Sequence, residues 1–287
     1  MNAPPFPTNP QVGSRYQSWV WNGSRWVCSP GGMIVNTQVF MGSGTYSPSA
    51  GLVTAVATCV GGGAAGGSAG PATSALQILG GGGGGSGGWS RKTIPAALVL
   101  GGVTVSIGAG GTPTDADEYG GSGGPTSFGA FCVAYGGLGG GWNGLGGSAN
   151  AWGEGGAAAS PGIGDLGFPG DAGSPGVSII LSAAQSNAYA VAKGGTIFGG
   201  ARTYAWGPNQ IPGGMSSYPN TGAGGSGALL NQIATGAISQ GGVGGSGICW
   251  VDEYCWLAGG DGDCGDCGGQ ARVAYSGWRG HDPFGDS

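Results

Sequence analysis

The sequence predicts a mainly β protein with extensive irregular structure, in which a small antiparallel β-sandwich or sheet carries packed polyglycine II or polyproline II-like segments. Three observations lead to this fold class. Glycine supplies 74 of the 287 residues, it comes in runs, and the segments between the runs alternate apolar and polar residues. An alternation with period two is typical of strands. No segment shows a convincing helical stripe, and the best candidate, 183–193, is short.

The glycine content decides between order and disorder. Each ordered glycine loses about 0.5–1 kcal/mol more backbone entropy than alanine, whereas a folded domain is stable by only about 5–15 kcal/mol. Disorder requires low hydrophobicity and high net charge, but this chain is 39% hydrophobic and 7% charged. We therefore expect the glycine runs to pack side by side as threefold extended helices, with N–H groups bonding the carbonyls of neighbouring segments.

Residues 1–32 are predicted to form an N-terminal attachment module. Asn-Gly at 22–23 is a preferred pair for a two-residue hairpin turn. This turn places Trp19 opposite Trp26, with Trp21 on the same face. Three indoles form an apolar face that a two-stranded ribbon cannot bury alone. The face packs either on the next domain of the chain or on a larger assembly.

A glycine-rich domain is predicted over 33–256, with a turn at 43–48. Its strand candidates are 33–35 with 38–40, 52–60, 98–107, 131–135, 177–181 and 248–254. The glycine tracts between them are 61–70, 80–88, 120–124, 136–147, 153–176 and 222–247. Structureless loops of this length are uncommon in compact domains, so the tracts require a repeating extended conformation.

One tract, 164–176, keeps a strict Gly-X-Y period over four triplets, with Pro169 and Pro175 in the third place. Four triplets are few for a collagen-like triple helix. A single polyproline II strand in a local bundle is the favoured interpretation, and a trimeric stalk is the alternative.

Cysteine and aspartate mark the predicted C-terminal tail, 257–287. Four of the seven cysteines lie near or within it: Cys249, Cys255, Cys264 and Cys267. Only the last two have the two-residue gap of zinc knuckles and redox motifs, so disulfides or free thiols are favoured over a metal site. The acidic turn at 261–266 lacks the length and final glutamate of an EF-hand loop. We predict no metal and no cofactor.

Several function classes are disfavoured. The eight Lys and Arg residues are scattered and form no basic stripe for nucleic acid. Residues 51–70 lack the apolar content of a membrane span, and the N-terminus shows no secretory signal. The single histidine, His281, supports no catalytic triad, and we expect no enzymatic activity. A glycosidase-like carboxylate group at 115–118 is the alternative.

Two parts of the chain resemble bacteriophage proteins. Val39-Phe40, the run from Ser43 to Tyr46, and the passage from Val53 to Gly63 resemble the opening of the glycine-rich domain of phage tail fibres and receptor-binding tip proteins. Residues 244–254 resemble its closing strand. The N-terminal residues, with Trp21-Asn22-Gly23 and Trp26-Val27, are similar to short modules at the front of phage tail proteins.

The resemblance implies a structural virion protein, made in the host cytoplasm, that binds a host-cell surface receptor and attaches to other virion tail proteins. Large aromatic residues between glycine tracts are the expected receptor contacts, although each of them could equally cover the scaffold. The receptor-binding candidates are Trp142, Trp152, Tyr204, Trp206 and Tyr218, and the attachment candidates are Trp19, Trp21 and Trp26.

Other hypotheses are a non-binding tail, collar or head-fibre component and an ice-binding polyproline II bundle. We also expect a homo-oligomer, and most simply a trimer. Both the entropy cost of glycine and the indole face call for partner surface.

Overall fold

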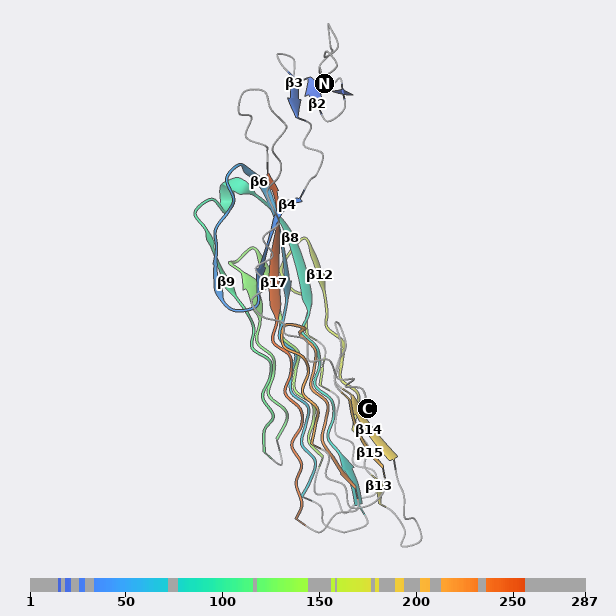
Figure 1. Cartoon of the computed structure of the whole chain (residues 1–287). Coiled ribbons are helices and arrows are strands. Elements are labelled where there is room, and N and C mark those ends of the chain that lie inside the picture. Colours follow the sequence, from blue (N-terminus) through green and yellow to red (C-terminus); the bar gives the residue numbers. More distant parts are fainter. Residues whose placement is uncertain are drawn as a thin grey trace, which may run out of the picture.

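Five β-sheets and a bundle of extended chain segments make up the described part of the computed structural model (Figure 1). It describes residues 15–16, 19–21, 26–28, 34–71, 77–115, 118–143, 156–157, 159–176, 179–180, 189–193, 202–206, 213–231 and 236–255. Within this part of the chain there are strands and one short 3-10 helix, η1 (Ala96–Leu98), but no α-helix. The predicted mainly β fold is confirmed.

A β-sandwich forms one end of the glycine-rich domain. Its five-stranded sheet has the order β12 (Leu166–Phe168), β8 (Trp89–Pro95), β6 (Leu52–Val60), β17 (Ile248–Cys255) and β4 (Ile34–Phe40). Its four-stranded sheet has the order β11 (Cys132–Ala134), β10 (Thr126–Phe128), β9 (Val103–Ser106) and β5 (Gly44–Tyr46). All these neighbouring strands are antiparallel.

The inner faces of the two sheets bury a single apolar core. Tyr46 meets Phe128 edge to face, with ring centroids 5.2 Å apart. In the other sheet, the central strand β6 presents small residues to this core: Ala55, Ala57 and Cys59. The strand is buried on both faces from Ala55 to Val60. The side chains of β6 alternate as predicted between two faces of the sheet, but over most of the strand both faces are buried.

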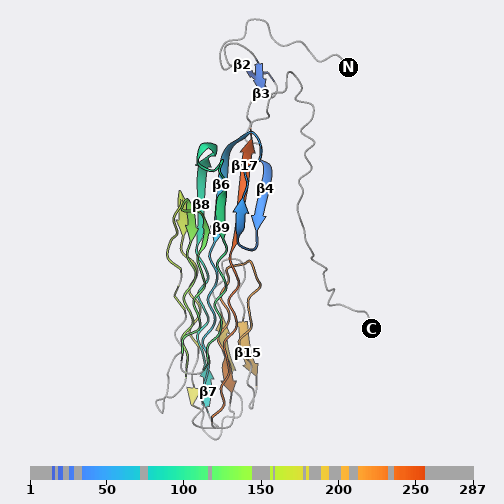
Figure 2. The same ribbon diagram turned by 90° about the vertical axis from the view of Figure 1, so that its left-hand side faces the viewer.

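The strands of the sandwich continue directly into the bundle. Strand β6 runs into 61–70 and β11 into 135–143, whereas 80–88 leads into β8 and 239–247 into β17. Figure 2 shows these segments running side by side away from the sandwich. The order of strands in the sheets therefore sets which glycine tracts become neighbours.

The segment 61–70 lies at the centre of the bundle and shows its bonding rule. Successive backbone N–H groups donate in turn to three different neighbours, at 2.8–2.9 Å. A chain with three residues per turn has this symmetry. Its carbonyls accept from three further segments, so six neighbours surround it: 80–88, 120–124, 239–245, 137–143, 222–228 and 108–111. The prediction that N–H groups of the glycine runs bond to carbonyls of neighbouring segments is confirmed.

This packing leaves no room for side chains at the contact positions. A Cβ atom on Gly63 would lie 2.0 Å from the Ala223 carbonyl oxygen, and one on Gly67 would lie 2.0 Å from that of Gly141. Real Cβ atoms do not approach a backbone oxygen so closely. Glycine is therefore required here for close approach of the backbones.

The Gly-X-Y tract is part of the same bundle. The Ser174 carbonyl accepts from the Gly83 N–H at 2.9 Å, and the Asp171 carbonyl accepts from the Ser86 N–H at 2.9 Å. Added Cβ atoms at Gly173 and Gly176 would lie 2.0 and 1.9 Å from carbonyl oxygens of the 80–88 segment. From Pro169 onward the tract is one extended strand of a local bundle, as favoured above, whereas its first part contains the short edge strand β12.

A small sheet closes the distal end of the bundle, opposite the sandwich. It consists of β13 (Ile179–Ile180), β7 (Gln77–Gly80) and β16 (Leu229–Asn231). A second apolar cluster lies there, made of Ala69, Leu79, Ala228 and Leu230.

Some predicted elements were wrong in type or extent. Residues 43–48, predicted as a turn, contain strand β5. Its pairing with β9 places Tyr46 in the core. The candidate strand 98–107 is reduced to β9, and η1 precedes it. The short helical candidate 183–193 contains strand β14 (Tyr189–Lys193), which pairs with β15 (Arg202–Trp206). Partner strands, absent from local propensity, decide these cases.

Gly67→Ala should destabilise the protein by about 3 kcal/mol or more, because the added methyl group forces two backbones apart. Gly42→Ala is the matched control, since its Cβ atom would meet nothing within 4 Å. The midpoints of urea unfolding measure both effects. Equal midpoints for the two variants would contradict the packing described here.

Candidate functional site

Chain connections gather at the distal end of the bundle. The Asn143 N–H donates to the Ser68 carbonyl at 3.0 Å, and the Gly70 N–H donates back to the Asn143 carbonyl at 2.8 Å. Ala69 forms a bridge with Ser239 at the same level. The described residues that flank 72–76 and 232–235 therefore lie at this end.

Three of the predicted receptor-binding positions lie at this end. Trp142 precedes Asn143 and is half-buried. Tyr204 and Trp206 belong to β15, which lies beside β16 in the distal sheet. Figure 1 shows β14 and β15 at the same end as β13. The backbone thus brings these three positions to one region, which is the candidate functional site.

A fourth receptor candidate, Tyr218, does not join them. Tyr218 is 79% exposed, and its backbone lies against Gly245, near the sandwich. Gly245 is bonded to Gly63, five positions before Ser68, which separates Tyr218 from the level of Trp142 by roughly 15 Å along a polyproline II-like axis. Trp152 lies outside the described residues.

The predicted attachment residues lie in a three-stranded sheet of β1 (Arg15–Tyr16), β2 (Trp19–Trp21) and β3 (Trp26–Cys28). Trp21 is paired with Trp26, and Trp19 with Cys28. The predicted pairing of Trp19 with Trp26 was wrong, because four residues rather than two connect the strands. Figure 1 shows this sheet beyond the sandwich, opposite the distal end.

A second surface, which sequence reasoning missed, lies on the outer side of the five-stranded sheet. We call it the apolar outer face: Val39, Trp89, Leu166, Phe168 and Trp250. One row of the sheet aligns Phe168 with Trp89, whose rings lie 5.5 Å apart. The next row aligns Leu166, Arg91, Thr58, Trp250 and Val39 across all five strands.

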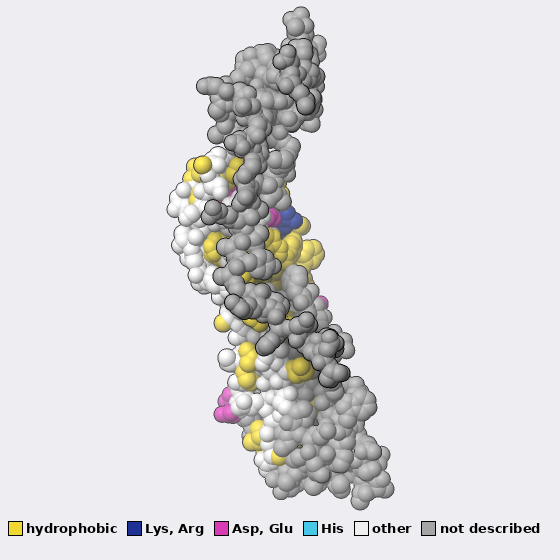
Figure 3. All heavy atoms as spheres, in the orientation of Figure 1, with side chains coloured by type: hydrophobic (Ala, Val, Ile, Leu, Met, Phe, Trp, Pro, Cys, Tyr) yellow, Lys and Arg dark blue, Asp and Glu magenta, His cyan; other side chains and the backbone are white. Residues whose placement is uncertain are grey.

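The apolar outer face is open at its edges. Leu166 and Phe168 on the edge strand β12 are 53% and 56% exposed, and Val39 on the opposite edge is 52% exposed. Figure 3 shows hydrophobic side chains gathered over the part of the sandwich where β12 lies. The alternation of β17 was visible in the sequence, but the contribution of β8 and β12 was not.

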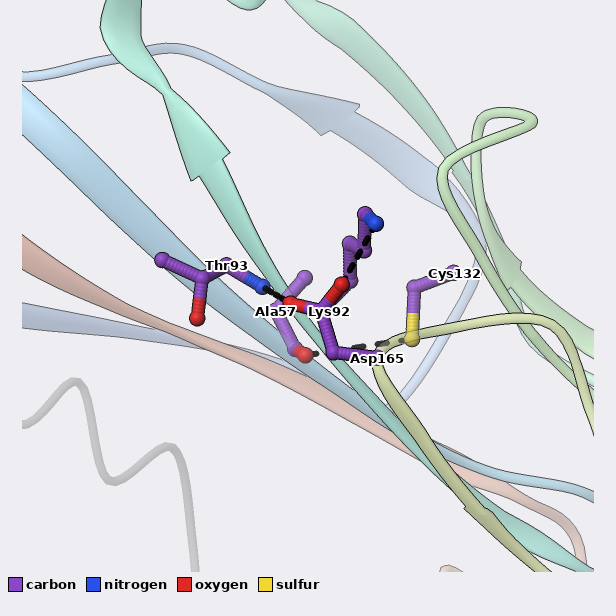
Figure 4. Close-up of polar contacts among 5 residues, drawn as sticks. All are labelled: Ala57, Lys92, Thr93, Cys132 and Asp165. Atoms are coloured by element: carbon purple, nitrogen blue, oxygen red, sulfur yellow. Dashed lines mark hydrogen bonds and ion pairs between the residues drawn. The ribbon is translucent and has the colours of Figure 1, made fainter.

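Asp165 fastens the edge strand β12 to β8. Its carboxylate accepts hydrogen bonds from the Lys92 ammonium group and, at 2.8 Å, from the Thr93 N–H (Figure 4). The hydrogen bond from Lys92 is the largest cause that lowers the pKa of Asp165, followed by that from Thr93. Because the ion pair is exposed, it adds little stability, and its effect is to position β12.

Asp115, from the acidic group considered for glycosidase chemistry, is used in local structure. Asp115 accepts a hydrogen bond from the Gln240 side chain at 2.9 Å, and its carbonyl accepts one from the Ser68 hydroxyl at 3.0 Å. Asp117 lies outside the described residues. Among the groups that the structure describes, no cluster of His, Cys, Asp or Glu could hold a metal ion.

Cysteine placement differs from the pattern expected near the C-terminus. Cys249 lies in the sandwich core beside Cys59, and Cys255, at the end of β17, is a free thiol. Cys264 and Cys267 lie outside the described residues. The neighbour of Cys249 in the core is thus Cys59, which is far away in sequence. The spacing of the last four cysteines does not indicate this contact.

Glu253 is the buried acid of the sandwich. Its carboxylate accepts five hydrogen bonds, from the Tyr46 hydroxyl at 2.7 Å, the Ser49 N–H at 2.9 Å, the Ser49 hydroxyl at 2.6 Å, the Asn36 amide at 2.8 Å and the Gln38 amide at 3.4 Å. These donors come from β4, β5 and the residues that follow β5. The carboxylate is therefore saturated by protein donors and ties these segments to β17.

Hydrogen bonds keep the Glu253 carboxylate ionised. Burial by itself would raise the pKa of Glu253, but the bonds from Ser49, Tyr46 and Asn36 outweigh it and lower the pKa below its ordinary value. Burial, together with the hydrogen bond to Glu253, raises the pKa of Tyr46. Tyr46 thus stays a donor and Glu253 stays an anion.

Glu253→Gln should destabilise the protein by about 2 kcal/mol or more at neutral pH, because an amide group then faces donors that need acceptors. The wild-type contribution is complete above the unfolded pKa of about 4.3 and is lost as the pH falls through the lower folded value. Unfolding followed from pH 7 to pH 3 should show a steeper loss of stability for the wild type. Asp252→Asn, at a neighbouring carboxylate bonded by Thr37 at 2.8 Å, should keep that steeper loss.

Most of this chain matches a known protein family. No curated protein matches the sequence. Within the described residues, no helix has the length and apolar content needed to cross a membrane. The family defined as "Glycine-rich domain" matches residues 37–254, which run from within β4 to within β17 and include the whole bundle. The chain therefore belongs to the glycine-rich domain family.

Proposed function

We propose that this protein is a structural component of a virion, a phage tail-fibre or tip protein that binds a host-cell surface receptor through the distal end of its bundle. The observation that carries this proposal is the separation of the two ends. The three-stranded N-terminal sheet lies beyond the sandwich, whereas the distal sheet of β13, β7 and β16 and the β14–β15 pair lie at the far end (Figures 1 and 2). Attachment and recognition thus have separate places.

The bundle is suited to act as a rigid spacer between the two ends. In its centre the backbone groups bond to six neighbouring segments, and the contact positions carry no side chain that could change rotamer. The requirement for glycine is visible in the tracts, and we propose that it does not extend to the connections between them. Those connections can differ in sequence while the scaffold is retained, as in other proteins that display binding loops on a rigid framework.

Aromatic residues supply the proposed contacts. Trp142, Tyr204 and Trp206 lie in the distal region, and large aromatic side chains contribute much of the energy at contact sites. Sugar rings of a host-surface polysaccharide can stack on such side chains. We propose a structural and binding role without catalysis, in which Trp19, Trp21 and Trp26 face other virion tail proteins.

A second candidate is a non-binding tail, collar or head-fibre component. The apolar outer face favours this function, because exposed apolar patches on the side of a protein mark contacts with other proteins. Both candidates share the proposed assembly, a homotrimer in which copies meet through this face.

Trp142→Ala should reduce adsorption of the purified protein to host cells at least tenfold, because the variant removes a large contact surface at the distal end. Tyr218→Ala is the matched control, since it removes an exposed aromatic near the sandwich and should leave adsorption unchanged. Binding of fluorescently labelled protein to whole cells measures both. A wild-type protein that never adsorbs, yet is retained in particles, would favour the non-binding component.

Phe168→Asp should convert the trimer to monomers, because it places a charge in the apolar outer face. Leu100→Asp changes an equally exposed apolar residue in the turn after η1 and should leave the trimer intact. Light scattering at micromolar concentration gives the mass of each variant. A monomeric mass for the wild type would refute the proposed assembly.

A further inference from the structure

Three completely buried cysteines meet in the core of the sandwich. Cys59 lies on β6, Cys249 on β17 and Cys132 on β11 of the opposite sheet. Cys59 and Cys249 are directly opposite each other in the antiparallel register, and their Sγ atoms are 3.7 Å apart. All three are free thiols in this structure.

The backbone geometry at Cys59 and Cys249 is compatible with a disulfide. Directly opposite residues of an antiparallel pair have Cα atoms about 4.5–5.5 Å apart, which lies within the range of about 4.4–6.8 Å that a disulfide spans. The two Sγ atoms must approach to about 2.05 Å. Small rotations of the two side chains bring them closer while the register of β6 and β17 is kept.

Cys132 is oriented differently. Its thiol donates to the Ala57 carbonyl at 3.8 Å (Figure 4), and its own carbonyl accepts from the Cys59 thiol at 3.6 Å. The Cys132 thiol thus bonds to the backbone of β6, and the Cys132 carbonyl bonds to the Cys59 thiol. The sulfur that faces Cys59 across the ladder belongs to Cys249.

We propose that Cys59 and Cys249 are a latent cross-link site, which a two-electron oxidant such as hydrogen peroxide converts into a disulfide. One thiol is oxidised to a sulfenic acid with release of water, and the second thiol displaces a second water to form the S–S bond. Two thiols and one peroxide thus give one disulfide and two waters. A reducing cytosol keeps the thiols reduced, and the cross-link follows exposure to oxidant.

The cross-link would join the strand that leads into the first bundle segment to the strand that follows the last one. It joins the central strand β6 to β17 across 190 residues of sequence, and the entire bundle lies between the two cysteines. Joining such distant residues restricts the unfolded chain more than the folded one. The oxidised protein therefore resists unfolding better than the reduced protein, whatever its biological function.

The reaction should be slow in the folded state. Interaction with Cys132 lowers the pKa of Cys59, but interaction with Cys249 and burial outweigh it and raise the pKa. The thiolate that reacts with peroxide is then scarce at neutral pH. Oxidation consequently takes place during transient opening of the sandwich or during refolding.

The test compares the full chain refolded with hydrogen peroxide and with a phosphine reductant. Free thiols are alkylated in denaturant, and peptides are mapped by mass spectrometry without reduction. We expect a linked pair of peptides containing Cys59 and Cys249, lighter by two hydrogens than the separate thiol peptides. We also expect a Tm several degrees above that of the reduced protein, and a return to the lower value on reduction.

Two variants identify the pairing. Cys132→Ala removes a cysteine from the same core and should keep both the linked peptide and the rise in Tm. Cys249→Ala should lose both. If Cys249→Ala does not fold, the wild-type peptide map still decides the pairing.

A Cys59–Cys132 link, a link from Cys249 to Cys264 or Cys267, or full alkylation of Cys59 and Cys249 after refolding in peroxide would each overturn the proposal.

Discussion

Hydrogen bonding between bare backbones is the constraint on which the rest of this structure depends. In segment 61–70 successive N–H groups donate to three neighbours, and carbonyls accept from three more. Each such bond contributes only about 0.5–1.5 kcal/mol net. The network is complete only when all neighbours are present. Bundle formation is therefore cooperative, and a single side chain at a contact such as Gly63 disturbs several segments at once.

Glycine tracts have no side chains, so they carry no information about which tract packs beside which. The strands do carry such information: Tyr46, Phe128 and Val251 fill an apolar core, and Glu253 collects donors from three segments. The strands lead directly into the tracts, so the sheet register is passed to the bundle. Apolar burial and polar saturation thus fix the arrangement at one end, and backbone bonding extends it.

This division of labour also organises the proposed function. A scaffold whose contact positions need only glycine places no demands on the connections between its segments. The distal region around Trp142 and the β14–β15 pair can serve recognition without altering the tracts. The apolar outer face and the N-terminal sheet lie on the sandwich side of the molecule, where the proposed contacts with copies and other tail proteins belong.

The sequence by itself determined the fold class, because glycine content and strand alternation are local properties. Strand β6 has the predicted bounds, since the run from Leu52 to Val60 is uninterrupted, and β17 differs from its prediction by one residue. Strand β8 was missed because its charged residues and Pro95 hide the inward positions of Ser90 and Ile94. The alternation of the last strand did not show that Glu253 is buried.

Only the tertiary structure decided which tracts are neighbours, since identical glycine runs cannot distinguish one another by chemistry. It also decided that Trp142, Tyr204 and Trp206 share one end while Tyr218 lies near the other. It brought Cys59 beside Cys249 across 190 residues. Local sequence fixes what a segment can form, whereas long-range strand pairing fixes what that segment meets.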